Sequence, residues 1–215
     1  MRYFIIGDIH GCFHTFKNML EKHWNHNEEI LIQLGDLIDR GKKSPQMVEY
    51  ARELHGNFSE KVFFLRGNHE FEMIEHFTKE PNHNWLRQCG EETLRQYEVA
   101  NRDCESDVKW MKDLPLFWEN DYLFISHAGI AEEASDPFLE DDEYSVIWNR
   151  SRLKNIGKLQ IIGHTPCRNP SYDENSNSWN IDTAAAYSGY LTGVKIDSLG
   201  RVIEFVRGNT DLRDK

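Results

Sequence analysis

Cysteine is sparse in this sequence and is not paired in any metal-binding or redox motif. The chain has 215 residues and four cysteines, at Cys12, Cys89, Cys104 and Cys167. No two of them form the CxxC spacing of a structural zinc site or a thioredoxin-like redox site. A chain of this length also buries a substantial core without covalent cross-links. We therefore expect free thiols, as is usual in a reducing cytoplasm.

Positive charge and long apolar runs are scarce as well. Lys and Arg number 25 against 36 Asp and Glu, so the formal net charge is −11. An acidic surface is repelled by nucleic acids and by anionic membranes, and we expect neither as a partner. No apolar run approaches the ~20 residues of a membrane span, and Met1 leads directly into a strand-like segment without a cleavable apolar leader. These features predict a globular cytoplasmic protein, with a monomer as the default state.

The N-terminal part of the chain alternates strand and helix signals. Short apolar runs at 3–6, 29–34 and 61–65 each end near a glycine, and helical spacing over 15–24 and 44–54 separates them. Ser44 is a candidate N-cap before Pro45. This β-α-β-α-β order predicts parallel strands joined by crossover helices.

A helical insertion and a second set of strands follow. Residues 71–120 are rich in charge and aromatics and carry helix signals at 91–97 and 107–112, without a flanking linker. Strand runs return at 122–126, 159–163, 179–182, 191–196 and 202–206, with a hairpin turn at 197–200 and a polar loop at 169–178. We expect an α/β fold with two sheet regions in a single domain, residues 1–215, that carries the insertion over one edge.

Residues suited to metals and phosphate follow five of the strand runs. The segments are GDIHG (7–11), GDLIDRG (35–41), RGNHE (66–70), SHAG (126–129) and GHT (163–165). Ligands bind at the carboxyl ends of strands in α/β sheets. Each segment alone is typical of an ordinary turn, but turns do not require histidine, and the five together indicate one joint site.

The donor types in these segments favour particular metals. Oxygen and imidazole donors without cysteine suit Mn²⁺, Fe or Zn²⁺. If Asp36 bridges two ions, they lie ~3.5–4 Å apart, as in two-metal hydrolytic sites. Two divalent ions against Asp8, Asp36 and a hydroxide leave a net charge of about +1, which would attract phosphate to an acidic protein.

As a set, the five segments resemble the phosphoprotein phosphatase branch of the calcineurin-like metallophosphoesterases. The resemblance runs from Asp8 to Asp182 and includes WLRQCGEETL (85–94) and VIWNR (146–150), which are similar to segments of small bacterial and phage serine/threonine protein phosphatases. It implies a two-sheet β-sandwich flanked by helices. It also implies a phosphomonoesterase that acts on phosphoserine, phosphothreonine and, by extension, phosphotyrosine of a protein or peptide partner.

The resemblance also implies a role for each site residue. The metal ligands would be Asp8, His10 and Asp36 for one ion, most readily Mn²⁺, and Asp36, Asn68, His127 and His164 for the second. A hydroxide held between the two ions would attack phosphorus in line. His69, oriented by Asp39, would protonate the leaving oxygen. Arg40, Arg150 and Asn68 would hold the phosphoryl oxygens.

One alternative enzyme class and several residues stay open at this point. Symmetrical dinucleoside tetraphosphate hydrolases resemble the same segments, but they tend to lack the aspartate at Asp39 and to read GNHD where this chain has Glu70. An inactive relative is disfavoured because every ligand is present. We expect Arg66 to form a structural ion pair and 140–143 to be a solvated acidic loop or, alternatively, a surface that favours basic peptides.

Asp182 is a further candidate, as an outer support for a ligand histidine. The family usually has glycine after the threonine that follows this aspartate, whereas this chain has Ala184. That departure affects the backbone next to the site.

Overall fold

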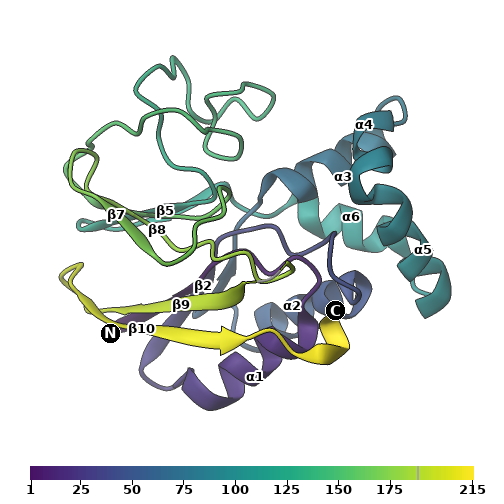
Figure 1. Ribbon diagram of the computed structural model, residues 1–215, viewed down its shortest axis with the longest axis horizontal. Coiled ribbons are helices and arrows are strands. Elements are labelled where there is room, and N and C mark those ends of the chain that lie inside the picture. The colour runs from purple at the N-terminus through teal and green to yellow at the C-terminus, as the bar shows by residue number, and fades with distance from the viewer. Residues whose placement is uncertain (188) are drawn as a thin grey trace.

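Two five-stranded mixed sheets pack face to face in the computed structural model, which describes residues 1–187 and 189–215 (Figure 1). The first sheet has the order β10-β9-β1-β2-β3, formed by Val202–Asn209, Tyr190–Ile196, Arg2–Ile6, Glu29–Gln33 and Val62–Phe64. The second has the order β4-β5-β6-β8-β7, formed by Phe117–Glu119, Leu123–Ser126, Leu159–Ile162, Ser178–Asn180 and Ser171–Asp173. The predicted two-sheet sandwich is confirmed.

Strand alternation divides the core between the two faces of the first sheet. Along β1, Tyr3 and Ile5 point toward the second sheet and pack with Leu123 and Ile161. Phe4 and Ile6 point the other way, into the layer beneath the helices. The sheets therefore share one apolar interior, and a second apolar layer lies outside the first sheet.

Helices cover the outer face of the first sheet and one end of the sandwich. Helices α1 (Phe13–His23) and α2 (Ser44–Asn57) are the crossovers that connect the parallel strands β1, β2 and β3. The expected insertion corresponds to α3 to α6, with η1, and these helices gather at one side in Figure 1. They comprise α3 (Asn68–Thr78), α4 (His83–Trp85), η1 (Leu86–Gly90), α5 (Glu91–Ala100) and α6 (Cys104–Lys112). A last short helix, η2 (Leu212–Asp214), ends the chain, and no helix among the described residues is long and apolar enough to cross a membrane.

The structure differs from the sequence expectations in three places. The segment 169–178 is not a polar loop throughout, because Ser171–Asp173 pairs antiparallel with β8 as the edge strand β7. The segment at 117–119 is a strand rather than part of the helical insertion. Lys43 rather than Ser44 occupies the N-cap of α2, and the Ser44 hydroxyl instead accepts a hydrogen bond from the backbone N–H of Asp39. Ser44 therefore anchors a loop of the site.

Candidate metal centre

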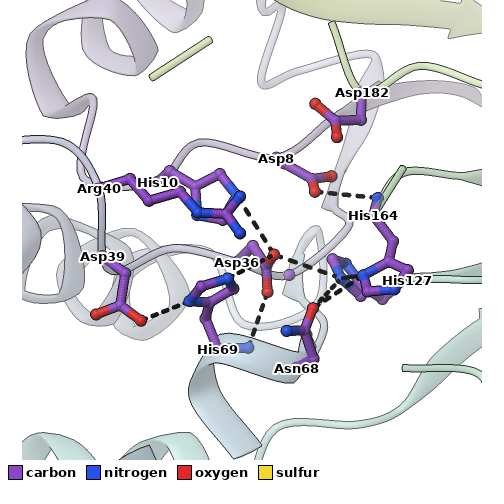
Figure 2. Close-up of polar contacts among 12 residues, drawn as sticks. Asp8, His10, Asp36, Asp39, Arg40, Asn68, His69, His127, His164 and Asp182 are labelled. Atoms are coloured by element: carbon purple, nitrogen blue, oxygen red, sulfur yellow. Dashed lines mark hydrogen bonds and ion pairs between the residues drawn. The ribbon is translucent and has the colours of Figure 1, made fainter. Parts of the chain in front are cut away.

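Asp36 lies at the centre of the polar cluster formed by the strand-end segments (Figure 2). Its Oδ2 lies 3.4 Å from His10 Nε2, 3.5 Å from His127 Nε2 and 3.9 Å from His69 Nε2. Its Oδ1 accepts a hydrogen bond of 3.1 Å from the backbone N–H of His69. The carboxylate thus lies between two groups of donors, as expected for a bridging ligand.

Three acceptor atoms converge on one side of Asp36. Asn68 Oδ1, His127 Nε2 and His164 Nδ1 lie 2.9 to 3.1 Å from one another. The other nitrogen of each ring faces a carbonyl oxygen. His127 Nδ1 lies 3.0 Å from that of Leu34, and His164 Nε2 lies 3.1 Å from that of Trp148. Those nitrogens must carry the protons, which leaves lone pairs on the converging atoms. A cation bound among these atoms would satisfy all three acceptors.

The histidines are held in the neutral form that metal ligation requires. Burial lowers the pKa of His127 and lowers the pKa of His164 to about 2. Burial likewise lowers the pKa of His10 to about 3. His10 Nδ1 faces the carbonyl oxygen of Ile38 at 3.1 Å, so its Nε2 presents a lone pair toward Asp36.

Asp8 is buried next to the group formed by Asn68, His127 and His164, and one of its carboxylate oxygens has no hydrogen-bond partner among the described residues. Its Oδ2 accepts a hydrogen bond of 3.0 Å from the backbone N–H of His164, whereas Oδ1 has no partner among the described residues. Burial and the neighbouring Asp182 and Asp36 raise the pKa of Asp8 well above its usual range. A buried carboxylate oxygen without a partner is costly unless a cation compensates it. The residues present therefore fit two divalent cations, one on each side of Asp36.

The close packing of these side chains explains the glycines in the motifs. A Cβ on Gly67 would overlap Asp36 Oδ1, and one on Gly163 would overlap Asp8 Oδ1. Several site residues also have left-handed backbone at positive φ, namely His10, Asp36, Asp39, Arg40 and His164. Non-glycine residues adopt this conformation at a cost of about 1–3 kcal/mol each, and such strain clusters at functional sites.

His69 forms a buried ion pair with Asp39. Its Nδ1 lies 2.5 Å from Asp39 Oδ2, which also accepts a hydrogen bond of 2.8 Å from Trp85 Nε1. Asp39 Oδ1 accepts one from the Thr93 hydroxyl. Burial lowers the pKa of His69, but Asp36 and Asp39 outweigh burial and hold it well above its usual range. Trp85 and Thr93 were not predicted as site residues, although both lie in the 85–94 segment that carried the resemblance.

Glu70 is a third residue whose role the sequence did not reveal. Its Oε2 accepts hydrogen bonds from the backbone N–H groups of Asp36 at 2.8 Å and Gly67 at 2.9 Å. Its Oε1 accepts a hydrogen bond of 2.8 Å from the backbone N–H of Leu37. Burial and the charge of Asp36 raise the pKa of Glu70 to about 7. One carboxylate thus joins two ligand-bearing loops.

The two predicted phosphate-binding arginines lie at the edge of the cluster. Arg40 Nη1 lies 2.8 Å from His10 Nε2, and the guanidinium lies 5.3 Å from the centre of the Tyr187 ring. Arg150 donates a hydrogen bond of 3.2 Å to the Thr165 hydroxyl, and both arginine side chains are exposed. Both guanidinium groups are therefore accessible to a ligand that enters from solvent.

Arg66 is a structural residue, as predicted. It forms an ion pair with Glu140 and donates to the carbonyl oxygens of Lys112 and Leu114. Glu140 is therefore engaged, and the 140–143 stretch is not solvated throughout.

Asp182 faces Asp8 rather than a histidine (Figure 2). Its Oδ1 accepts a hydrogen bond of 2.9 Å from the backbone N–H of Ala184, and among the described residues it makes none to a histidine. Burial raises its pKa to about 6. Ala184 has φ of 59°, so the left-handed backbone that suits glycine is kept without glycine.

Comparison with known proteins identifies the family. The calcineurin-like phosphoesterase family matches residues 1–197 of the chain. The chain belongs to this family. The match confirms the resemblance carried by the strand-end segments. Candidate metal-binding groups lie on both sides of Asp36, one with His10 and His69 and one with His127 and His164.

The relatives of this phosphoesterase include two kinds of enzyme. The asymmetrical bis(5'-nucleosyl)-tetraphosphatase PrpE of Bacillus cereus is 28% identical over 235 residues, which cover 94% of this chain and 93% of the relative. Serine/threonine-protein phosphatase 1 of Salmonella typhimurium is 29% identical over 203 residues, which cover 89% and 90%. A protein serine/threonine phosphatase structure from Saccharomyces cerevisiae, 18% identical, shares the fold with a TM-score of 0.67 over 97% of this chain and 80% of that one.

Proposed function

We propose that this phosphoesterase is a metal-dependent phosphomonoesterase that removes phosphate from phosphoserine and phosphothreonine, and by extension phosphotyrosine, in proteins. The His69–Asp39 pair carries this proposal. A serine or threonine alkoxide is a poor leaving group and needs a proton as it departs. His69 retains its proton through Asp36 and Asp39, with Nδ1 held by Asp39 and Nε2 turned toward Asp36.

The remaining residues would bind and orient the phosphoryl group. Asp8, His10, Asp36, Asn68, His127 and His164 would hold two divalent ions, for which we propose Mn²⁺. When bound, such ions supply an activated water and neutralise phosphate charge. Arg40 and Arg150 would hold the phosphoryl oxygens through paired N–H groups, and the Asn68 amide would donate to a third oxygen.

The surface beside Arg150 supports a peptide substrate. A pocket of about 590 Å³ adjoins this arginine and is lined by Asp141, Glu143, Tyr144, Trp148, Arg150 and Ser151. Trp148 connects it to the metal centre, because its carbonyl oxygen faces His164. Two carboxylates in this wall would repel the additional phosphates of a dinucleoside polyphosphate, whereas a peptide flanking a phosphoserine meets no such repulsion.

Hydrolysis of dinucleoside tetraphosphates is the second candidate function. The similarity to an enzyme of that name over nearly the whole chain favours it. Its leaving group is a nucleotide phosphate, which departs with less help from an acid than an alkoxide does. The His69–Asp39 pair therefore argues for the monoester.

A direct competition between substrates tests the proposal. The Mn²⁺-loaded protein is assayed with a phosphoserine and phosphothreonine peptide mixture and, separately, with diadenosine tetraphosphate at matched concentration. We expect faster phosphate release from the peptides. Faster cleavage of the dinucleotide would overturn the proposal, and its products, two ADP or ATP with AMP, would show symmetrical or asymmetrical cleavage.

A further inference from the structure

Cys89 lies beside the His69–Asp39 pair, outside the dinuclear centre. Its Sγ is 3.7 Å from His69 Nδ1. Ligand atoms of Asp39, His69 and Cys89 all lie within 4.8 Å of one another. The two partners are almost fully buried, whereas Cys89 is half-buried and reachable from solvent. Sulfur, nitrogen and oxygen donors thus meet at a partly exposed residue.

A local distortion of the helix places the thiol there. Residues Leu86–Gly90 form a π-helical turn between α4 and α5, and such turns are frequent at functional sites. Trp85, Cys89 and Thr93 follow one another at intervals of four residues and all reach the Asp39–His69 pair. A π-turn has more residues per turn than an α-helix, so it keeps this spacing on one face.

We propose that Asp39, His69 and Cys89 form a third metal site, separate from the dinuclear centre, that binds Zn²⁺. A tetrahedral zinc ion with Zn–S of about 2.3 Å and Zn–N of about 2.0 Å holds sulfur and nitrogen about 3.5 Å apart. The observed separation of 3.7 Å matches. The separation of His69 Nδ1 and Asp39 Oδ2 must widen from 2.5 Å to roughly 3.3 Å, and water takes the fourth position.

The donor set favours zinc at this site over the ions proposed for the dinuclear centre. A thiolate is a soft ligand that selects zinc over manganese. None of the six ligands proposed for the dinuclear centre is a cysteine. Binding releases two protons, one from the Cys89 thiol and one from His69 Nδ1, since both donors must be deprotonated.

Occupancy of this site has a consequence for catalysis that rests on the proposed function. Zinc bound to His69 Nδ1 would displace the proton that this nitrogen donates in its hydrogen bond to Asp39. That hydrogen bond, which orients the ring, would be lost. His69 then no longer serves as the leaving-group acid. We expect Zn²⁺ to inhibit the Mn²⁺-loaded enzyme through Cys89, although the existence of the site does not depend on the substrate.

Cobalt spectroscopy tests the site without any activity measurement. Co²⁺ takes tetrahedral zinc sites, and a bound thiolate gives a near-ultraviolet sulfur-to-cobalt charge-transfer band that oxygen and nitrogen ligands do not. We expect this band in the wild-type protein titrated with Co²⁺, its loss on addition of Zn²⁺ and its absence from Cys89→Ser. Matched controls are Cys104→Ser and Cys167→Ser, half-buried thiols outside the cluster, which should keep the band.

Two results would overturn the site. One is the lack of a charge-transfer band in the wild-type protein, and the other is a band that survives Cys89→Ser. A circular dichroism spectrum and a Tm close to those of the wild type would show that Cys89→Ser is folded.

Zinc inhibition tests the consequence separately. With the dinuclear centre loaded with Mn²⁺, we expect Cys89→Ser to need at least about tenfold more Zn²⁺ for half-inhibition than the wild type. If the cobalt band depends on Cys89 but zinc inhibits both proteins equally, the site stands and inhibition through Cys89 is refuted, because zinc then acts elsewhere, as by displacing Mn²⁺ from the dinuclear centre.

Discussion

Asp36 Oδ2 lies nearly equidistant from two imidazole nitrogens, 3.4 Å from His10 Nε2 and 3.5 Å from His127 Nε2. Burial opposes the charge of this carboxylate, but the surrounding histidines, above all His127 and His69, keep its pKa below the usual range. Asp36 is therefore ionised and shared between two donor groups. On this geometry, the proposed dinuclear centre depends on Asp36 for both of its ions.

Asp36→Asn should abolish activity and lower the metal stoichiometry. The amide keeps the shape of the carboxylate but removes the negative charge and one bridging oxygen. Metal content after gel filtration, measured by atomic emission, should fall below two ions per chain. Asp113→Asn is the matched control, because Asp113 is exposed and is not among the proposed ligands. This variant should retain both ions. Two retained ions in Asp36→Asn would contradict the bridge.

His69→Asn should separate substrates by their leaving groups. The metals should remain, because His69 is not among the six proposed ligands. Turnover of phosphoserine peptide should fall about 10²–10⁴-fold, the usual contribution of a general acid. Turnover of p-nitrophenyl phosphate should fall far less, because nitrophenolate departs without a proton. Equal losses for both substrates would show that His69 is not the leaving-group acid.

Asp39→Asn should shift the pH dependence of phosphopeptide turnover. In the proposed mechanism the protonated ring of His69 is the active form, so we expect turnover to fall as the pH rises through its pKa. Asp39 raises the pKa of His69 through the 2.5 Å contact, and its neutralisation lowers that pKa. The alkaline limb of kcat should therefore move to lower pH. The alkaline limb of kcat for p-nitrophenyl phosphate is the internal control and should keep its position. If the limb for the phosphopeptide also keeps its position, Asp39 does not set the pKa of His69.

Ala184→Gly should stabilise the protein. Ala184 has φ of 59°, a conformation that costs an L-residue about 1–2 kcal/mol and glycine almost nothing. After the larger backbone entropy of glycine is subtracted, we expect a gain of up to about 1 kcal/mol, or roughly 2–4 °C in Tm. Ala51→Gly, in the middle of α2, is the control and should lower Tm. A decrease for both variants would show that position 184 is not strained.

The clustering of the candidate ligands could be anticipated from the sequence because it depends on local patterns. Each ligand follows a short apolar run that ends near a glycine, and the carboxyl ends of the parallel strands of both sheets meet at the same end of the sandwich. Asp8, Asp36 and His127 illustrate this, since each follows a strand directly or within three residues. The glycines could be recognised for the same reason, and the structure shows that Gly67 and Gly163 leave room for the ligands themselves.

The partners of those residues could not be predicted in the same way. Trp85 reaches Asp39 across 46 positions, and Glu70 reaches the backbone of Asp36 across 34. Ser44 resembles an ordinary helix cap in the sequence, yet it binds a loop of the site. The edge strand β7 forms within a segment of polar residues because β8 provides a pairing partner.

Fold class, family and the donor types of the proposed metal centre could thus be inferred from local properties, namely residue type and strand period. Three contacts emerged only from the folded chain: the pairing of His69 with Asp39, the carboxylate of Glu70 that joins two loops, and the position of Cys89 beside His69. The physical reason is that these contacts join segments distant in sequence. Their energy comes from packing in a dry interior, where hydrogen-bond partners are chosen by proximity rather than by spacing along the chain.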